Sequence, residues 1–393
     1  MVEFHLHGSP AVVSATLNAL SKLDHFRLAG AGEFTKRAFM NGKMSFVEVE
    51  ALGDLLNAET EAQRKQALRG VNGELIDKCW AWRTLLMRSL AHAETIIDFS
   101  DDVDDESMQL VDAAKDLKAI RDEMQHLLSG FDRAQLIKNG LRVTLCGPPN
   151  AGKSSLLNIL VGSNAAIVSS IPGTTRDVLR VDMNLDGYKV ILQDTAGLHS
   201  AGDEVEKEGI HRAVAAARES GLQVILVDIT GDVCNEVEDV FKQVQQNRDQ
   251  TQGQSQTIIV LNKTDLCGEE VVSKQCELIR QHFPDVLHVV PISCKTRHEV
   301  ARLTDCMTNV VREMLTTTEG DIPSDLITRE RQRNCLEQCV HCITNCINLS
   351  EESLVDLQAE ELRMSLKALS RLTGDVDVEE ILDIVFSDFC IGK

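Results

Sequence analysis

Residues 147–155 read Gly-Pro-Pro-Asn-Ala-Gly-Lys-Ser-Ser, and this loop is the strongest indication of how its part of the chain folds. It lies between the apolar run 143–146 and a helix-like run that starts with Leu156. A glycine-rich loop between a strand and a helix points backbone N–H groups at phosphate oxygens, aided by the positive end of the helix. Lys153 would then meet the β- and γ-phosphates, and the Ser154 hydroxyl would bind Mg²⁺. The predicted phosphate loop comprises Asn150, Ala151, Gly152, Lys153, Ser154 and Ser155.

Strand and helix patterns alternate on the carboxyl side of this loop. Apolar runs at 189–193, 222–228, 257–261 and 287–290 predict further buried strands, and helical periodicity separates them. Such alternation is typical of a parallel α/β sheet. Helical periodicity also fills 46–137 and 326–386, so we expect an α/β domain inserted into a helical one. The predicted parts are an N-terminal domain at 1–45, a helical domain at 46–139 and 319–393, and the α/β domain at 140–318.

Three further stretches predict that the nucleotide is GTP. Asp194-Thr-Ala-Gly follows a strand, and its carboxylate would hold Mg²⁺ while the Gly197 N–H senses the γ-phosphate. Asn-Lys-Thr-Asp at 262–265 follows the next strand but one, and Asp265 can accept two hydrogen bonds from guanine that adenine cannot offer. Ser-Cys-Lys at 293–295 follows the last strand. The predicted GTP contacts here are Asp194, Thr195, Ala196, Gly197, Asn262, Lys263, Asp265, Ser293, Cys294 and Lys295.

A candidate switch loop lies between the phosphate loop and Asp194. It reads Ser-Ser-Ile-Pro-Gly-Thr-Thr-Arg-Asp from residue 169, and Thr175 is the candidate that closes over Mg²⁺ and the γ-phosphate. Leu198 stands where many GTPases place a glutamine that positions water. Charge that develops on the transferred phosphoryl group still needs a cation. Arg176 could supply it, or the Asn150 carbonyl could bind a monovalent ion. Asn150 could equally be an amide that only stabilises the loop.

Composition excludes several classes of protein. The formal net charge of -21 argues against binding nucleic acid through a broad basic surface. No run of 18 apolar residues exists, so we expect no membrane insertion. Twelve cysteines without a secretory signal indicate a reducing compartment. Four of them recur at helical spacing, as small core residues or, less well, as zinc ligands: Cys335, Cys339, Cys342 and Cys346. Residues 2–6 read as a strand that lacks what should precede it.

At this point several motifs resemble one family. GPPNAGKSSLLN, IPGTTRD, DTAGL, DEVEKEGI and the terminal FCIGK are similar to the tRNA-modification GTPases of the MnmE/TrmE family, in eukaryotes a mitochondrial form. VEFHLHG and GEFTKRAFMNGK extend the similarity to the amino end. The resemblance implies an α/β P-loop GTPase domain inserted into an all-α helical domain. It also implies an α+β N-terminal folate-binding domain, partial here, that forms a homodimer.

The resemblance further implies hydrolysis stimulated by K⁺, with transient pairing of the G domains. Matching residue by residue places K⁺ on Asn150, Ser169, Ile171 and Thr174, and Mg²⁺ on Ser154, Thr175 and Asp194. Glu206 falls where the family has its water-orienting glutamate, although the residues alone favour a charged helix start. The implied catalytic residues are Glu206, Lys153 and Thr175. The implied nucleotide contacts of the switch loop are Ser169, Ser170, Ile171, Pro172, Gly173, Thr174 and Thr175.

The family also has a substrate and a partner. With a FAD flavoprotein of the MnmG/GidA type it modifies the wobble uridine of tRNAs, using a one-carbon unit from 5-formyl- or 5,10-methylene-tetrahydrofolate. The folate ligands that carry over are Glu3, Lys43 and the terminal Lys393, and Cys390 is a weaker candidate for a catalytic thiol. A mitochondrial location follows from the same resemblance. The alternative is a non-modifying GTPase of the regulatory or ribosome-assembly type, or a truncated form without folate chemistry.

Overall fold

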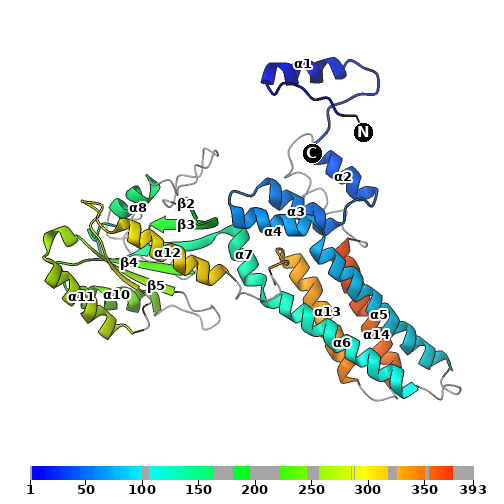
Figure 1. Cartoon of the computed structure of the whole chain (residues 1–393). Helices are drawn as coiled ribbons and strands as arrows, with labels where there is room; N and C mark the ends of the chain where they lie inside the picture. The colour runs from blue at the N-terminus through cyan, green and yellow to red at the C-terminus, as the bar shows by residue number, and fades with distance from the viewer. Residues whose placement is uncertain are drawn as a thin grey trace, which may run out of the picture. The chain divides into compact units, whose positions relative to one another are not determined.

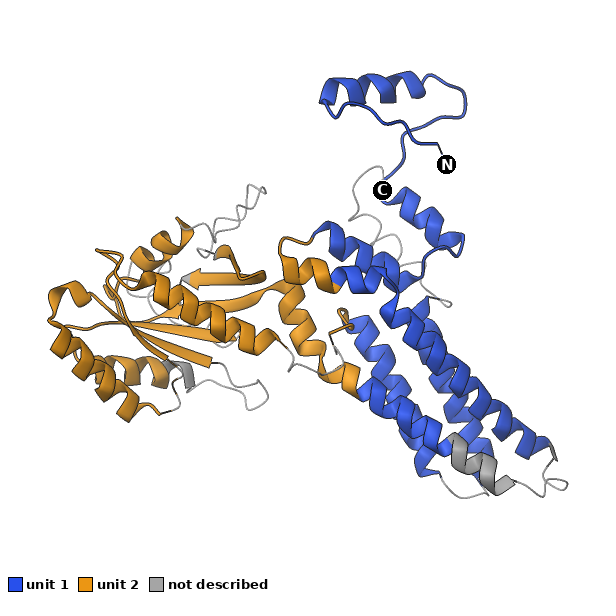
Figure 2. Cartoon of the chain, viewed as in Figure 1, with its two compact units in different colours: residues 1–57, 67–125, 330–393 blue, residues 58–66, 126–329 orange. Residues whose placement is uncertain are grey.

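The computed structural model describes residues 2–99, 106–162, 180–194, 221–245, 256–284, 286, 288–316, 325–349 and 354–374. The chain divides into two compact units (Figure 2). We call the first the helical unit, and it consists of Met1–Asn57, Ala67–Gln125 and Glu330–Lys393. The second, the sheet unit, consists of Ala58–Gln66 and His126–Arg329. Each unit therefore draws on segments that are far apart in the sequence.

Long helices form the helical unit, as the apolar periodicity predicts (Figure 1). A capping box begins the helix at Phe46: the Ser45 hydroxyl accepts from the Glu48 N–H at 3.3 Å, and the Glu48 carboxylate accepts from the Ser45 N–H at 2.6 Å. The helices that lie wholly in this unit are α1 (Pro10–Leu20), α2 (Glu33–Met40), α3 (Phe46–Leu56), α5 (Glu74–Phe99), α13 (Glu330–Asn348) and α14 (Val355–Thr373). Helices α4 (Glu61–Val71) and α6 (Glu106–Ser129) contribute residues to both units.

A buried ion pair joins three helices of this unit. Glu50 of α3 is 5% exposed and lies 2.9 Å from the Arg331 guanidinium of α13. Gln332 donates a second hydrogen bond to the same carboxylate oxygen at 2.8 Å. Arg331 also donates to the Arg371 carbonyl at the end of α14, at 2.8 Å, and its guanidinium carbon lies 4.5 Å from the centre of the Phe46 ring. The cluster ties α3, α13 and α14 together.

A six-stranded sheet in the order β2-β3-β1-β4-β5-β6 forms the centre of the sheet unit. All neighbouring strands are parallel except β2 and β3, which form an antiparallel hairpin. The strands are β1 (Leu141–Cys146), β2 (Arg180–Leu185), β3 (Tyr188–Asp194), β4 (Leu222–Asp228), β5 (Gln256–Asn262) and β6 (His288–Pro291). The helices are α7 (Phe131–Asn139), α8 (Lys153–Val161), α10 (Val233–Gln245), η2 (Thr264–Leu266), α11 (Glu269–His282) and α12 (Val300–Leu315).

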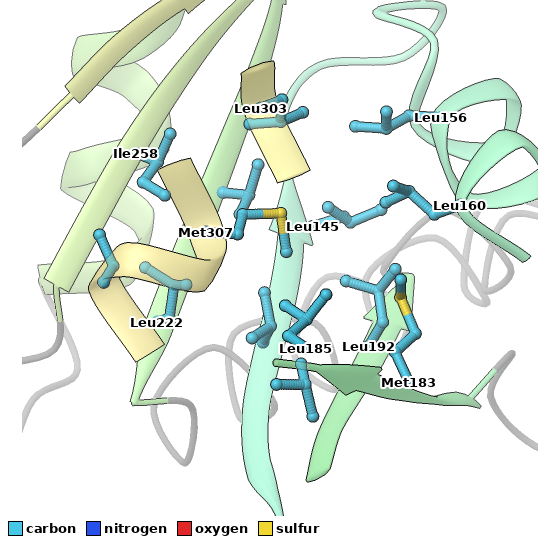
Figure 3. Packing of buried hydrophobic residues seen from close by; sticks show 14 of the residues in the cluster. Leu145, Leu156, Leu160, Met183, Leu185, Leu192, Leu222, Ile258, Leu303 and Met307 are labelled. Atoms are coloured by element: carbon cyan, nitrogen blue, oxygen red, sulfur yellow. The ribbon is translucent and has the colours of Figure 1, made fainter. Parts of the chain in front are cut away.

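Two hydrophobic clusters cover the two faces of this sheet. On one face, side chains of β1, β3 and β4 pack against Leu156 and Leu160 of α8 and Leu303 and Met307 of α12 (Figure 3). On the other face, β4 and β5 pack against α10 and α11, for example through Val237 and Ile279. The sheet unit is thus a three-layer α/β structure, and the central strands are buried on both faces, as parallel strands require.

The short segment 58–66 belongs to the sheet unit although helical-unit residues flank it in sequence. Its Ala62 N–H donates to the Gly187 carbonyl in the β2–β3 turn at 3.0 Å, and Glu59 pairs with Lys189 of β3. Gln63 donates to the Lys138 carbonyl at the end of α7 at 2.8 Å. The segment therefore supports the β2–β3 hairpin from outside the continuous α/β stretch.

The structure confirms most of the predicted elements and corrects two. The strands predicted at 143–146, 189–193, 222–228, 257–261 and 287–290 correspond to β1, β3, β4, β5 and β6. The sequence analysis missed β2, whose signal is the Asp186-Gly187 turn, with φ of 51° and 88°. The strand predicted at 2–6 is wrong: residues 2–9 form no strand. A strand needs a hydrogen-bonded neighbour, and no strand among the described residues pairs with this segment.

Candidate nucleotide site

Two glycines of the 147–155 loop have conformations that exclude other residues. Gly147 has φ of 143°, and a Cβ there would lie 2.0 Å from the Leu226 carbonyl oxygen of β4. Gly152 has φ of 105°, and a Cβ there would lie 2.2 Å from the Asn262 side-chain nitrogen. Only glycine fits positive φ and such close backbone approach. The loop is therefore pressed against β4 and against the Asn-Lys-Thr-Asp motif.

The side chain of Lys153 lies within this loop. It is 5% exposed, and its ammonium donates to the carbonyls of Gly147 and Pro148 at 2.7 and 2.8 Å. These bonds hold the charge over the loop that was predicted to bind phosphate. Ser154 and Ser155, in the first turn of α8, are exposed. Asn150 is also exposed and has φ of 63°, which turns the loop at its tip.

Asn262 joins three of the predicted nucleotide loops. Its side chain is buried at the end of β5 and donates to the Ala151 carbonyl of the phosphate loop at 2.8 Å. The side-chain oxygen Oδ1 of Asn262 accepts from the Cys294 N–H of the Ser-Cys-Lys loop at 3.0 Å. The structure thus brings together stretches that are 111 and 32 residues apart in sequence. This is the arrangement that one bound nucleotide requires.

The Asp265 carboxylate, predicted to read guanine, is oriented by a second loop. Its Oδ1 accepts from the buried Ser293 hydroxyl at 2.6 Å. The Thr296 N–H donates to the oxygen of the same hydroxyl at 3.2 Å, while the single proton of that hydroxyl is donated to Asp265. Burial raises the pKa of the neighbouring Cys294 thiol to about 11, so this cysteine is a neutral thiol at pH 7. Lys295 follows it and is exposed.

Lys263 has a partner that the sequence analysis missed. Its ammonium lies 2.5 Å from Asp228 Oδ2, at the carboxyl end of β4. Asp228 Oδ1 accepts from the N–H and the hydroxyl of Thr230, at 3.0 and 2.7 Å. The available signal was the aspartate at the end of the predicted strand 222–228, which precedes the predicted strand 257–261 in the sequence. The parallel pairing of β4 with β5 places this aspartate beside Asn262 and Lys263.

The backbone of β3 fits the predicted Mg²⁺ site. Asp194 ends β3 in register with Leu145 of β1, two residues before Gly147, where the phosphate loop begins. A carboxylate from Asp194 and a hydroxyl from Ser154 are hard oxygen ligands of the kind that Mg²⁺ prefers. The chemistry of this donor set therefore suits the ion.

The remaining predicted site residues are not brought together by what the structure describes. Glu3 and Lys43 are both exposed, and their folate role stays a prediction. Others lie outside the described residues: Ser169, Ser170, Ile171, Pro172, Gly173, Thr174, Thr175, Arg176, Thr195, Ala196, Gly197, Glu206, Cys390 and Lys393.

The cysteine stripe of α13 behaves as core. Cys339, Cys342 and Cys346 are buried, and Cys339 Sγ lies 3.0 Å from the Ser365 hydroxyl of α14. Burial raises the pKa of Cys339 to about 12 and that of Cys346 to about 11. In the described part of the chain no three His, Cys, Asp or Glu side chains are grouped to hold a metal ion. Nor is any of its helices long and apolar enough to cross a membrane.

Comparison with known proteins agrees with this geometry. The family model of the MnmE helical domain matches residues 46–390, and that of the GTP-binding protein TrmE N-terminus matches residues 1–43. The chain belongs to the MnmE/TrmE family. It is 40% identical to the mitochondrial 5-taurinomethyluridine tRNA synthase subunit GTPB3 of Danio rerio, over 100% of this chain and 78% of that one. The human protein of the same name gives the same values. The tRNA modification GTPase MnmE of Rhodopseudomonas palustris is 39% identical, over 100% and 83%.

Membership in the MnmE/TrmE family confirms the predicted fold class. The sheet unit is the P-loop GTPase fold of that family, and the helices of the helical unit from residue 46 onward belong to the helical domain. Asp228 contacts Lys263, one of the predicted nucleotide-binding residues, and Thr230 bonds to Asp228.

Proposed function

We propose that this protein hydrolyses GTP and uses the cycle to modify the wobble uridine of tRNAs. The observation that carries the first part is the double hydrogen bonding of the Asn262 side chain, to Ala151 and to Cys294. It gathers the phosphate loop and both base loops around one space. Asp265, fixed by Ser293, then faces the guanine N1–H and amino group, and wrong bases leave it unpaired.

The catalytic step follows the requirements of phosphoryl transfer. Lys153 and an Mg²⁺ held by Ser154, Thr175 and Asp194 would neutralise the β- and γ-phosphates. Glu206 would orient the attacking water. K⁺, held by Asn150 and by Ser169, Ile171 and Thr174, would supply the positive charge that an arginine supplies elsewhere. The exposed Asn150, at the tip of the loop with positive φ, supports its place in this scheme.

The proposed tRNA reaction rests on the names of relatives that match the whole chain. A FAD-containing partner of the MnmG type and a tetrahydrofolate-derived one-carbon unit would complete it, with Glu3, Lys43 and Lys393 as folate ligands. A net charge of -21 makes delivery of the tRNA by that partner the simpler arrangement. The mitochondrial GTPB3 relatives support a mitochondrial location and a 5-taurinomethyl product.

Dimerisation through the N-terminal domain is part of the same proposal. Helix α1 buries none of its own residues in this chain, and large apolar side chains are exposed in it and in the segments before and after it: Val2, Phe4, Leu6, Val12, Val13, Leu17, Leu23, Phe26 and Leu28. An apolar surface of this extent on one short segment is typical of an interaction site.

GTP turnover in K⁺ and in Na⁺ tests the enzymatic proposal. We expect faster turnover in K⁺, and Asn150→Ala should abolish the difference while GDP still binds. Glu206→Ala should bind GTP and fail to hydrolyse it. Equal rates in both salts would contradict the role of K⁺, and loss of nucleotide binding in Glu206→Ala would make that residue structural. Restoration of wobble-uridine modification in cells that lack the endogenous family member tests the tRNA reaction.

A further inference from the structure

The residue that invites a further inference is Asp228, which ends β4. Strands β4 and β5 are parallel neighbours, and Asp228 lies in register with Asn262. The next residue, Lys263, has φ of 68°, a left-handed conformation that non-glycine residues seldom adopt. From that backbone its side chain reaches back to β4, and Nζ lies 2.5 Å from Asp228 Oδ2. The lysine is therefore fixed at both ends.

The Asp228 carboxylate is itself immobilised. Oδ1 accepts from the Thr230 N–H at 3.0 Å and from the Thr230 hydroxyl at 2.7 Å. The Ile229 N–H donates to the Asn262 carbonyl at 3.0 Å and holds the intervening loop against β5. Burial alone would raise the pKa of Asp228, but the bonds from Lys263 and Thr230 outweigh it and lower the pKa. A preorganised carboxylate loses little entropy when it holds a lysine, unlike most exposed pairs.

A second carboxylate lies nearby and supplies a comparison. Glu236 of α10 feels the charges of Asp228, Asp232 and Lys263, and burial followed by Asp228 raises its pKa. Its Oε2 is buried and accepts no hydrogen bond from any residue that the structure describes. The described contacts of Lys263 run to Asp228 and not to Glu236. Of these two acids, Asp228 contacts the lysine directly and Glu236 has no described contact with it.

The stem of Lys263 lies beside the base-reading residues. Asn262 precedes it and joins the phosphate and Ser-Cys-Lys loops, while Asp265 follows it by two residues. The ammonium is held by Asp228 of β4, so the side chain of Lys263 spans from the end of β5 to the end of β4. Lysine stems commonly cover apolar surface in this way. A purine whose edge meets Asp265 would rest its face on such a stem.

We propose that Asp228 is a positioning residue for guanine nucleotides, which anchors the ammonium of Lys263 so that the lysine stem forms one wall of the base pocket. The inference rests on the proposed GTP site. It gives a residue at the end of β4 a role in nucleotide affinity, although this residue lies outside the four GTP motifs. Asp228 acts through Lys263 and does not touch the nucleotide.

A mutant cycle on the full-length chain tests the proposal, with the dissociation constant of a fluorescent GDP as the readout. Asp228→Ala should raise the dissociation constant about 10-fold, the size expected for losing a charge-assisted contact. In a Lys263→Met background, which keeps a stem without the charge, Asp228→Ala should change it less than about 2-fold. Glu236→Gln is the matched control and should leave GDP affinity within about 2-fold of the parent.

Further readouts separate positioning from folding. Asp228→Asn keeps an oxygen for Thr230 and should weaken GDP binding less than Asp228→Ala. In turnover, the change should fall mainly on KM for GTP, with kcat much less affected. An Asp228→Ala effect of equal size in both backgrounds, or no effect on GDP affinity, would overturn the inference. If the parent protein itself fails to bind GDP, the proposed function is wrong, which is a different result.

Discussion

Replacement of Arg331 by methionine should destabilise the helical unit strongly. Methionine keeps the apolar stem against Phe46 but removes the charge that faces Glu50, which is 5% exposed. A buried carboxylate that loses its partner costs about 3–5 kcal/mol. Gln332 still donates to Glu50, so we expect the lower end of that range, about 3 kcal/mol. The lost bond to the Arg371 carbonyl at the end of α14 adds about 1 kcal/mol at most.

Urea unfolding followed by tryptophan fluorescence measures this loss of stability in the helical unit. The two tryptophans of the chain, Trp80 and Trp82, both lie in α5 of the helical unit. With an m-value of about 2 kcal/mol per molar, a loss of 3 kcal/mol lowers the midpoint by about 1.5 M. Tryptophan emission thus follows the helical unit even if the sheet unit unfolds separately.

A double mutant and a control sharpen the result. Glu50→Gln in the Arg331→Met background removes the stranded charge and should recover at least about 1 kcal/mol. Arg363 pairs with Glu94 on the exposed side of α14, so Arg363→Met should lower the urea midpoint far less than Arg331→Met does. A midpoint shift for Arg331→Met no larger than that of Arg363→Met would refute the reasoning. So would a double mutant less stable than either single mutant.

Three other predictions concern other parts of the molecule. Gly152→Ala places a Cβ 2.2 Å from Asn262 at a positive φ, so GDP affinity should fall at least about 10-fold in a fluorescence titration. The bonds from Arg27, the Gly30 N–H and Arg37 lower the pKa of Glu33 to about 2; a carboxyl NMR titration should show this. Whatever stability Glu33 adds is then present above its unfolded pKa and is lost as the pH falls toward 2, and Arg27→Gln should move its titration back toward ordinary glutamate values. Native protein at pH 7 should resist iodoacetamide at Cys339, whose pKa is raised to about 12, and become labelled in urea; rapid native labelling would contradict the burial of α13.

The sequence predicts the sheet unit well because its strands are buried on both faces. In a run such as 222–228, every residue but Gln223 and the final Asp228 is apolar, and its limits agree with β4. Strand β2 contains Asp182 and Asn184 and reads as polar, and only its antiparallel pairing with β3 makes it a strand. The predicted strand at 2–6 fails for the converse reason. Its apolar residues suit a sheet, but no described strand lies beside them.

The residues of the candidate nucleotide site also divide into those that the sequence predicts and those that it does not. Asn262, Asp265 and Ser293 could be predicted because each lies in a local motif with fixed spacing, and the structure brings these three together. Asp228 could not be predicted, because its contact with Lys263 depends on which strand lies next to β5. Contacts between residues distant in sequence require the topology, and local patterns do not contain it.

The support of the β2–β3 hairpin by residues 58–66 has a practical consequence for cutting the chain. A GTPase fragment that starts at residue 140, where the sequence suggests a domain boundary, would lack Glu59 and Ala62. Lys189 would then keep Asp182 as its partner at 3.0 Å, but the Gly187 carbonyl would lose its donor from Ala62. The hairpin ends at Asp194, so the loosened edge includes a predicted Mg²⁺ ligand. Nucleotide affinities measured on such a fragment would describe a weakened site, and the missing nine residues would have to be supplied in trans or by fusion.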